Sequence, residues 1–357
     1  MLGVLGNVPQ ALTDGGIELV DVEALAGLDA DLLQLRDDGL VGKVRRVDLE
    51  KLGGIREVFA LGHKNDPRDQ MEMTMDYREQ FAVKPGDKVR LGRIDPGYKG
   101  GHDNADKAVD AIAHYKQKLG EHQSVLYAEK RHSVLIVLQA LDAAGKDGTV
   151  NHVFTAFNAQ GARVAGFKQP TPEERAHDFL WRIRPHVPGR GEIAIFNRSH
   201  YEDVLVTRVH KLIDKDTWTT RYRRINEFEA LLAENDTTIL KFFLHIDRDQ
   251  QLARFAERLE DPGRNWKISE SDYSERALWD DYIAAFEDAM AATSTKHAPW
   301  YVIPANHKWF RNLAVSQIVA DTMHDLHMSY PKPSVDLVEI RRKYHSEVLR
   351  EKKHGAA

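Results

Sequence analysis

The residue types best suited to chemistry are concentrated in a short segment that combines glycines, a lysine and carboxylates. The segment Leu141-Asp-Ala-Ala-Gly-Lys-Asp-Gly-Thr149 follows an apolar run at Val134–Leu138 and precedes a helical pattern at 147–160. A loop in that position holds phosphate oxygens with backbone N–H groups, while its lysine supplies a point charge. The pattern predicts a phosphate-binding loop (P-loop), with an ordinary glycine-containing turn as the alternative. The expected phosphate contacts are Ala143, Ala144, Gly145, Lys146, Asp147, Gly148 and Thr149.

This loop departs from the usual P-loop pattern at two positions. Ala140 stands where the pattern has its first glycine, and Asp147 stands where it has serine or threonine. The loop also contains Asp142, whose negative charge repels phosphates unless a cation lies between them. Because the usual hydroxyl ligand is missing, we expect Asp142 to bind Mg²⁺, or Mn²⁺ in its place. The alternative is that Asp142 only forms a turn.

A second polar segment, Ile195-Phe-Asn-Arg-Ser-His-Tyr-Glu-Asp203, lies where a predicted strand at Glu192–Phe196 ends. Ligands of α/β sheets bind beyond the carboxyl ends of the strands, so these side chains should face the site. Asn197 stands where other P-loop enzymes keep the acid that organises Mg²⁺. His200 fits a structural or substrate-orienting role better than acid–base chemistry. The predicted catalytic residues are Asp142, Lys146, Arg198 and Glu202. The guanidinium of Arg198 can form bidentate bonds to phosphate.

Two basic regions flank these motifs. Residues 163–224 contain 13 Lys and Arg against 8 Asp and Glu, although the whole chain has a net charge of −5. Such an excess attracts phosphate chains, unless it is only part of a solvated surface of mixed charge. Residues 254–285 contain several arginines interrupted by Pro262-Gly263. That composition predicts a lid that closes over phosphates and excludes water, with a solvated loop and helix as the alternative.

The rest of the sequence sets the elements that must position these residues. From about residue 104, short apolar runs alternate with helical patterns, which predicts a parallel sheet with helices on both faces. The expected strands are Val134–Leu138, Arg163–Phe167, Glu192–Phe196, Thr238–Ile246 and Trp300–Pro304. The expected helices are Asp106–Lys118, His122–Lys130, 147–160, one that begins after Thr171 and carries Ile183, and Trp309–His327.

Composition limits the class of protein. The 357 residues are 42% apolar and include no cysteine, which excludes a disulfide framework and cysteine-based metal sites. We find neither a secretory signal nor an apolar run of membrane-spanning length, so we expect a soluble, cytoplasmic protein. Residues 1–70 hold 13 acids against 8 bases and none of the motifs, and are interpreted as an appendage to a 71–330 domain. Residues 331–357 are expected to form a partly helical tail.

Taken together, these motifs resemble the polyphosphate kinase 2 family, most closely its class III. The resemblance covers roughly residues 76–330. It is carried by Leu126-Tyr-Ala-Glu, Leu138-Gln-Ala-Leu-Asp-Ala-Ala-Gly-Lys-Asp-Gly-Thr149, Phe167-Lys-Gln-Pro-Thr-Pro-Glu-Glu174, Phe196-Asn-Arg-Ser-His-Tyr-Glu-Asp-Val-Leu205, and Asn265-Trp-Lys-Ile-Ser through Trp279.

The resemblance implies a P-loop kinase-like, three-layer α/β fold with a helical lid, and Mg²⁺ dependence. It implies reversible phosphoryl transfer from inorganic polyphosphate to AMP and ADP, yielding ADP and ATP, by a homo-oligomer (dimer or tetramer). Asp142 and Lys146 match the family's loop acid and lysine, while Asn197 stands where some classes have aspartate. Lys168, Arg198 and Arg208 become candidates for polyphosphate binding, and Arg258, Arg264, Lys267 and Asp272 for the lid.

Other functions stay open at this point. An ATP-dependent kinase of a small molecule would share the fold, but Asp147 in place of a hydroxyl residue counts against it. A non-catalytic polyphosphate-binding protein would have no need for Asp142 in the loop. Nucleic-acid binding is not expected, because the basic region lacks interleaved aromatic residues for base stacking.

Overall fold

The computed structural model describes residues 17–18, 44–45, 75–102 and 105–354. The chain divides into two compact units, Met1–Thr74 and Met75–Ala357. In the first unit the described residues form an antiparallel pair of two-residue strands, β1 (Ile17–Glu18) and β2 (Val44–Arg45). The rest of the appendage predicted at 1–70 lies outside the described residues.

The second unit is built on a six-stranded sheet in the order β3-β8-β7-β4-β6-β5. Five neighbouring strands are parallel, as the alternation of strands and helices predicts. These strands are β4 (Ser133–Gln139), β5 (Ala162–Gly166), β6 (Ile193–Asn197), β7 (Thr237–His245) and β8 (Trp300–Pro304). The sixth, β3 (Ala82–Val83), pairs antiparallel with β8 at one edge and was not predicted.

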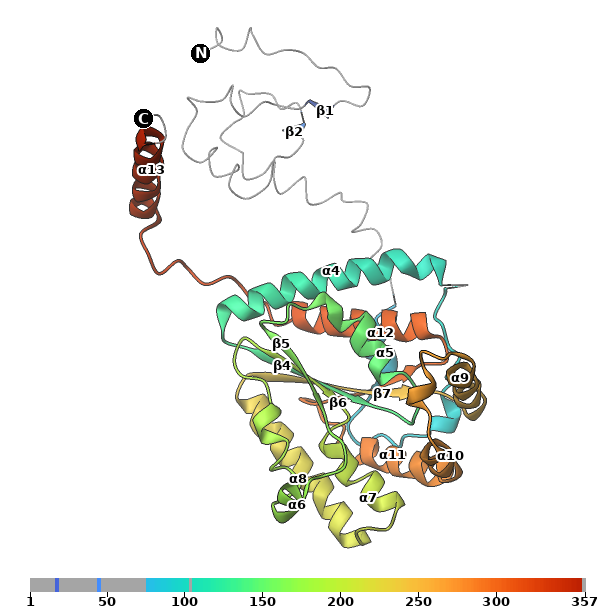
Figure 1. The fold of residues 1–357 in the computed structure, drawn as a ribbon. Helices are drawn as coiled ribbons and strands as arrows, with labels where there is room; N and C mark the ends of the chain where they lie inside the picture. The colour runs from blue at the N-terminus through green and yellow to red at the C-terminus, as the bar shows by residue number, and fades with distance from the viewer. Residues whose placement is uncertain (1–16, 19–43, 46–74, 103–104, 355–357) are drawn as a thin grey trace. The chain divides into compact units, whose positions relative to one another are not determined.

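Helices cover both faces of this sheet, so the unit has three layers (Figure 1). One face carries α4 (Asp106–Glu129), α5 (Lys146–His152) and α12 (Lys308–His324). The other carries α6 (Pro172–Ala176), α7 (Val206–Val209), α8 (Lys215–Glu234) and α11 (Trp279–Thr293). The three-layer α/β fold predicted from sequence is therefore confirmed.

The remaining helices flank this core. α3 (Tyr77–Phe81) precedes β3, and α9 (Arg248–Glu260) and α10 (Glu270–Ala277) lie between β7 and α11 in sequence. With the 3-10 turn Asn265–Lys267, they make most of the predicted lid at 254–285 helical. α13 (Leu337–His354) forms in the predicted C-terminal tail. No helix among the described residues is both long and apolar enough to cross a membrane.

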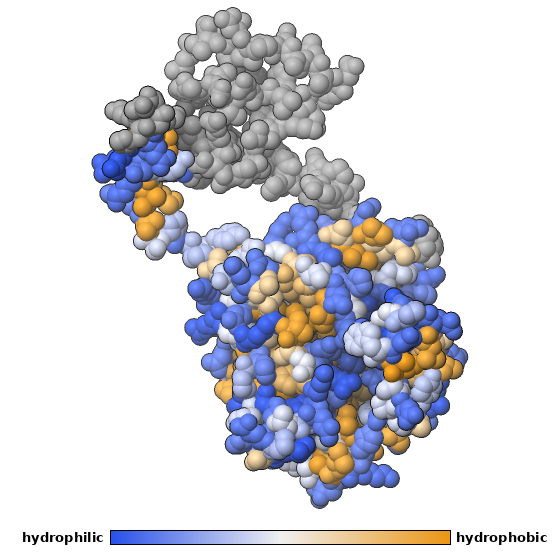
Figure 2. All heavy atoms as spheres, in the orientation of Figure 1, coloured by the Kyte–Doolittle hydropathy of each residue, from blue (hydrophilic) through white to orange (hydrophobic). Residues whose placement is uncertain are grey.

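Burial explains the apolar run in the central strand. All seven residues of β4 are buried, because β6 and β7 pair on either side and helices cover both faces. Hydrophilic residues predominate on the visible face of the second unit, while apolar residues gather in separate clusters (Figure 2). A run buried in this way marks the strand that leads into the predicted P-loop.

Four predicted helices differ from the structure. The two expected at 106–130 are one helix, since Gly120 does not interrupt α4 and lies against the carbonyl of Ala156. The helix expected at 147–160 ends at His152 and continues as a 3-10 turn at Phe154–Ala156.

The fourth is the helix that begins after Thr171. Its predicted capping box is present, because Thr171 and Glu174 bond each other's backbone N–H groups. The helix nevertheless ends at Ala176 rather than reaching Ile183. Asp178 starts a turn there by accepting a hydrogen bond from the backbone N–H of Leu180 at 3.0 Å, which competes with helical bonding.

Candidate active site

The predicted P-loop connects the carboxyl end of β4 to α5. It requires unusual backbone angles, since Ala143 has φ +62° and Gly145 has φ +109°. A non-glycine residue pays for a positive φ in strain, so the packing around the loop must hold Ala143 in place. Thr149 closes the loop from the helix side, because its backbone N–H donates to the Gly145 carbonyl at 2.9 Å. The strand–loop–helix context predicted from sequence is present.

Lys146 extends back along the loop. Its Nζ donates to the carbonyl of Ala140 at 2.9 Å. Burial lowers the pKa of Lys146, and the nearby Asp142 carboxylate partly opposes that effect. The ammonium group is therefore incompletely compensated by the protein and suits an additional anionic ligand.

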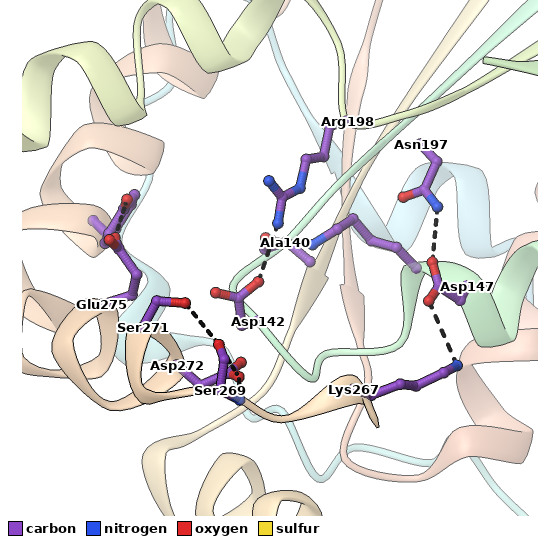
Figure 3. A network of polar contacts seen from close by, with 12 residues as sticks. Ala140, Asp142, Asp147, Asn197, Arg198, Lys267, Ser269, Ser271, Asp272 and Glu275 are labelled. Atoms are coloured by element: carbon purple, nitrogen blue, oxygen red, sulfur yellow. Dashed lines mark hydrogen bonds and ion pairs between the residues drawn. The ribbon is translucent and has the colours of Figure 1, made fainter. Parts of the chain in front are cut away.

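Arg198 brings the end of β6 to the P-loop. Its Nη2 lies 3.4 Å from Oδ1 of Asp142, and Figure 3 shows the two side chains pointing toward each other. Arg198 has φ +66°, and its backbone N–H donates to the Leu138 carbonyl of β4 at 3.1 Å. Strain of this kind persists where the surroundings over-determine the conformation, and it recurs at functional sites.

A buried polar network fixes the segment that carries Arg198. Nζ of Lys241 in β7 donates to Oε2 of Glu229 at 2.6 Å, to the Tyr201 hydroxyl at 2.9 Å and to the Thr293 carbonyl at 2.7 Å. Nε2 of His200 lies 3.2 Å from Oε1 of Glu229. Lys241, Glu229 and His200 are fully buried, which favours the structural role over the substrate-orienting role for His200.

Glu202 faces the same charges from the turn after β6. Burial raises its pKa, although the positive charges of Arg198 and Lys146 act in the opposite direction. Glu202 does not line the cavity described below. The attractive interactions found for it with charged groups are those with Arg198 and Lys146, and its catalytic role stays a prediction.

The lid is connected to the P-loop through Asp147. Nδ2 of Asn197 donates to Asp147 Oδ1 at 2.8 Å, and Nζ of Lys267 lies 3.8 Å from Asp147 Oδ2 (Figure 3). The residue that replaces the usual P-loop hydroxyl thus joins β6 and the lid. Within the lid, Arg258 pairs with Asp272, which also caps α10 through Ser269.

These elements enclose a cavity of about 990 Å³ at the carboxyl ends of the parallel strands. Three acidic side chains line it: Asp142, Asp147 and Glu257. Nine cationic side chains line it: Lys146, Lys168, Arg198, Arg254, Arg258, Arg264, Lys267, Lys308 and Arg311. Cations outnumber acids by three to one, so the cavity suits an extended polyanion.

The structure brings most of the predicted site residues to this cavity. Six of the predicted cations line it: Lys146, Lys168, Arg198, Arg258, Arg264 and Lys267. So do the predicted loop residues Asp142, Ala143, Gly145, Asp147 and Gly148. Ala144 does not, since it is fully buried and offers its carbonyl to Arg254. Thr149 is also buried, and its hydroxyl donates to the Gly145 carbonyl at 3.2 Å. These two residues shape the loop instead of facing the cavity.

Arg208 is a correction to the predicted polyphosphate contacts. It lies outside the cavity lining, where Nη2 pairs with Asp288 Oδ2 at 2.8 Å and Nη1 donates to the Tyr222 hydroxyl. Its guanidinium stacks over the Trp218 ring at 4.2 Å. The charge and the face of Arg208 are thus engaged in packing between helices, away from the cavity.

Sequence reasoning missed the contribution of the segment after β8. Lys308, Arg311 and Asn312 line the cavity from the first turns of α12. Their position in the sequence could have revealed them, because polar residues that follow each parallel strand gather at one edge of the sheet. Applying that rule to Trp300–Pro304 would have found them.

A divalent cation fits Asp142, but not as part of an all-protein cage. No group of three or more metal-ligating side chains occurs among the described residues. Mg²⁺ is commonly held by one or two carboxylates together with substrate phosphates and water. Asp142 uses Oδ1 toward Arg198, and within the described chain its Oδ2 has no hydrogen-bonding partner.

A parallel sheet with a phosphate-binding loop after its central strand, and cations collected at the strand ends, defines a phosphotransferase with a P-loop kinase-like fold. The family model described as polyphosphate kinase 2 matches residues 102–331. The chain belongs to the polyphosphate kinase 2 family, as the sequence motifs predicted.

Curated relatives and a crystal structure agree with this assignment. The AMP/ADP-polyphosphate phosphotransferase of Meiothermus ruber is 49% identical over 259 residues, covering 71% of this chain and 96% of the relative. The ADP-polyphosphate phosphotransferase of Rhodopseudomonas palustris is 43% identical over 270 residues, covering 71% and 92%. The crystal structure of polyphosphate kinase 2 from Arthrobacter aurescens TC1 matches with a TM-score of 0.74 and 40% identity, covering 76% of this chain and 97% of that chain.

Proposed function

We propose that this polyphosphate-dependent nucleotide phosphotransferase uses both AMP and ADP as acceptors, with Mg²⁺, or Mn²⁺ in its place, as cofactor. The observation that carries the proposal is the cavity beside the P-loop, with nine cationic and three acidic side chains. The relative from Meiothermus ruber, named for both AMP and ADP, supports this acceptor range.

The reaction exchanges one phosphoanhydride bond for another. An oxygen of the acceptor's terminal phosphate attacks the end phosphorus of polyphosphate, and the bond to the next phosphate of the chain breaks. AMP becomes ADP, or ADP becomes ATP, and the polyphosphate is one unit shorter. Because the bond formed and the bond broken are of the same kind, the reaction is reversible.

The residues act mainly by positioning and by neutralising charge. Lys146 and Arg198, which line the cavity from the loop and from the end of β6, would contact the transferred phosphoryl group. Asp142 would hold the cation, which supplies charge neutralisation between neighbouring phosphates. Lys168, Arg258, Arg264 and Lys267 would bind the remaining phosphates and close the lid over them.

The competing functions have less support. A non-catalytic binding protein disagrees with the phosphotransferase names of both relatives. For an ATP-dependent kinase of another molecule, the usual loop hydroxyl is replaced by Asp147, which is paired with Asn197. A cytoplasmic location and assembly into a dimer or tetramer stay predictions.

The test is incubation of the full chain with long-chain polyphosphate, Mg²⁺ and either AMP or ADP, followed by chromatographic separation of the nucleotides. We expect ADP and ATP to form without any organic phosphate donor, and no product when polyphosphate or the metal is omitted. Phosphorylation of a sugar or nucleoside by ATP, with polyphosphate inert, would refute the proposal.

A further inference from the structure

Arg311 is a buried cation whose charge has no partner of opposite sign. It lies in the first turn of α12 and is only 2% exposed. Its Nε and Nη2 donate to the side-chain oxygen of its neighbour Asn312, at 3.2 and 2.8 Å. Its Nη1 reaches the Ala144 carbonyl at 3.4 Å, which is a long and weak hydrogen bond. No ion pair with a carboxylate is found for Arg311 among the described residues.

Arg254 of α9 provides a contrast within the same cluster. Its Nη1 donates to the carbonyls of Ala143 and Ala144 at 2.8 and 2.9 Å, and its Nη2 to that of Asn306 at 3.0 Å. These hydrogen bonds connect the P-loop to the segment after β8. Holding the loop in place is therefore a sufficient role for Arg254. Hydrogen bonding does not account for Arg311 in the same way, because its one hydrogen bond to the loop is long.

The guanidinium groups of Arg311 and Arg254 lie close together, and their mutual repulsion makes it less favourable to bury a positive charge here without a negative partner. Burial lowers the pKa of Arg311 to about 9, and the nearby Arg254 adds to that effect. An uncompensated buried charge is unfavourable, and it is normally paired or offered to a ligand. The ligand that would restore the balance here is an anion.

The loop glycines leave room for this guanidinium. A Cβ on Gly145 would lie 1.9 Å from Nη1 of Arg311, and one on Gly148 would lie 3.1 Å from Nη2. Gly145 is also required by its φ of +109°, but Gly148 has no such backbone requirement. The glycine at 148 is therefore explained by the close approach of Arg311.

Arg311 also lies on the wall of the cavity that the P-loop lines. The adjoining cation Lys308 is already paired with Glu257 at 2.7 Å. Among the described residues on this side of the loop, Arg254 and Arg311 are both buried without a carboxylate partner, but Arg254 is held by short hydrogen bonds to carbonyls whereas Arg311 is not. Lys146 and Arg198 contact the cavity from other elements, β4–α5 and the end of β6.

We propose that Arg311 binds a phosphate of the polyphosphate chain, at a subsite on the α12 side of the P-loop. This inference rests on the proposed function for the identity of the polyanion. The bound phosphate is one that stays with the donor and is distinct from the phosphoryl group near Lys146. Arg311 would hold the donor chain against the loop while its end phosphate is transferred.

The test compares the full chain with Arg311→Gln by calorimetric titration of tripolyphosphate and, separately, of AMP. Removing a charge-assisted contact should weaken tripolyphosphate binding by about 10-fold to 100-fold and leave AMP binding within about 2-fold. Arg223→Gln, which removes an exposed arginine of α8 outside the cavity, is the matched control and should change neither.

Other results would overturn the inference. Unchanged tripolyphosphate binding would make Arg311 a structural residue, and weaker AMP binding alone would assign its phosphate to the nucleotide. Equal weakening of both ligands would indicate a disordered loop. Should Arg311→Gln fail to fold, Arg311→Met makes the same test, because it removes the charge and keeps an unbranched side chain in the buried position. The same selective loss is expected, and normal tripolyphosphate affinity would again refute the subsite.

Turnover is measured in parallel to separate the two proposals. An unsubstituted chain that binds tripolyphosphate through Arg311 but makes no ADP or ATP would refute the proposed function and leave the subsite standing. If the chain forms ATP from polyphosphate and Arg311→Gln leaves tripolyphosphate binding unchanged, the subsite is refuted and the proposed function stands.

Discussion

Replacing Asp142 by asparagine tests whether its carboxylate holds the metal. Asparagine keeps the size and hydrogen-bonding capacity of the side chain and removes only the charge. If the metal assignment holds, turnover should fall by about 100-fold or more, the effect of losing one electrostatic group in a reacting site. That loss corresponds to about 2.7 kcal/mol in the activation free energy.

The ion pair with Arg198 cannot produce a loss of that size. The side chains of Arg198 and Asp142 are 43% and 34% exposed, and their closest atoms are 3.4 Å apart. A pair this accessible to solvent is worth at most about 1 kcal/mol, or about 5-fold in rate. The amide oxygen introduced by Asp142→Asn would still accept a hydrogen bond from the arginine. The two explanations therefore predict effects that differ by more than tenfold.

The assay is steady-state ATP formation from polyphosphate and ADP at increasing Mg²⁺ concentration. Higher Mg²⁺ should partly restore the Asp142→Asn chain, because the remaining ligands and the phosphates still bind the ion weakly. Lys146→Met is the matched comparison, since it loses positive charge from the same loop and should not respond to the metal. Normal turnover with unchanged Mg²⁺ dependence in Asp142→Asn would refute the metal assignment.

A chain that begins at Met75 should fold and keep most of its activity, because it retains the whole second compact unit; loss of soluble protein would show that the preceding residues stabilise it. Lys241→Met should lower the free energy of unfolding by about 3–5 kcal/mol in a urea titration, since the buried Glu229 loses the ammonium group that neutralises it and keeps only its contacts with His200 and Tyr201. A loss below about 1 kcal/mol would contradict that reasoning. Glu202→Gln tests the raised pKa of that carboxyl group. The folded chain holds this proton more tightly than the unfolded chain, so ionisation lowers stability as pH rises between the two pKa values. The variant should therefore melt higher than the parent near pH 8 but not near pH 4; equal differences at both would exclude the shift.

Local patterns in the sequence were sufficient for the P-loop and the sheet. The phosphate loop was found because strand, loop and helix are consecutive in the chain, and their periodicity and glycine positions are visible without tertiary contacts. Asn197 and Arg198 were found for a related reason, since residues that follow a buried parallel strand must reach the ligand edge of the sheet. The capping box at Thr171 is a short-range pattern of the same kind.

Helix ends were less predictable because they depend on competition between nearby hydrogen bonds. Apolar spacing through Ile183 predicted a continuing helix, yet the side chain of Asp178 stops it by bonding the Leu180 N–H. Strand β3 was not predicted because it also depends on hydrogen bonds to another segment, in this case a distant one. Its two residues pair with β8, more than 200 positions later in the chain, and two residues alone have no detectable period.

The assignment of individual cations was decided only by tertiary structure. Arg208 and Lys168 lie in the same basic region of the sequence, but Arg208 is paired with Asp288 while Lys168 lines the cavity. Arg311 lies in a helix with no phosphate-binding motif, and it reaches the site because α12 packs beside the P-loop. Sequence determined that phosphate-binding chemistry is present, since its motifs are local. Which charges remain free to bind phosphate depends on partners that are distant in the chain and are brought together only by folding.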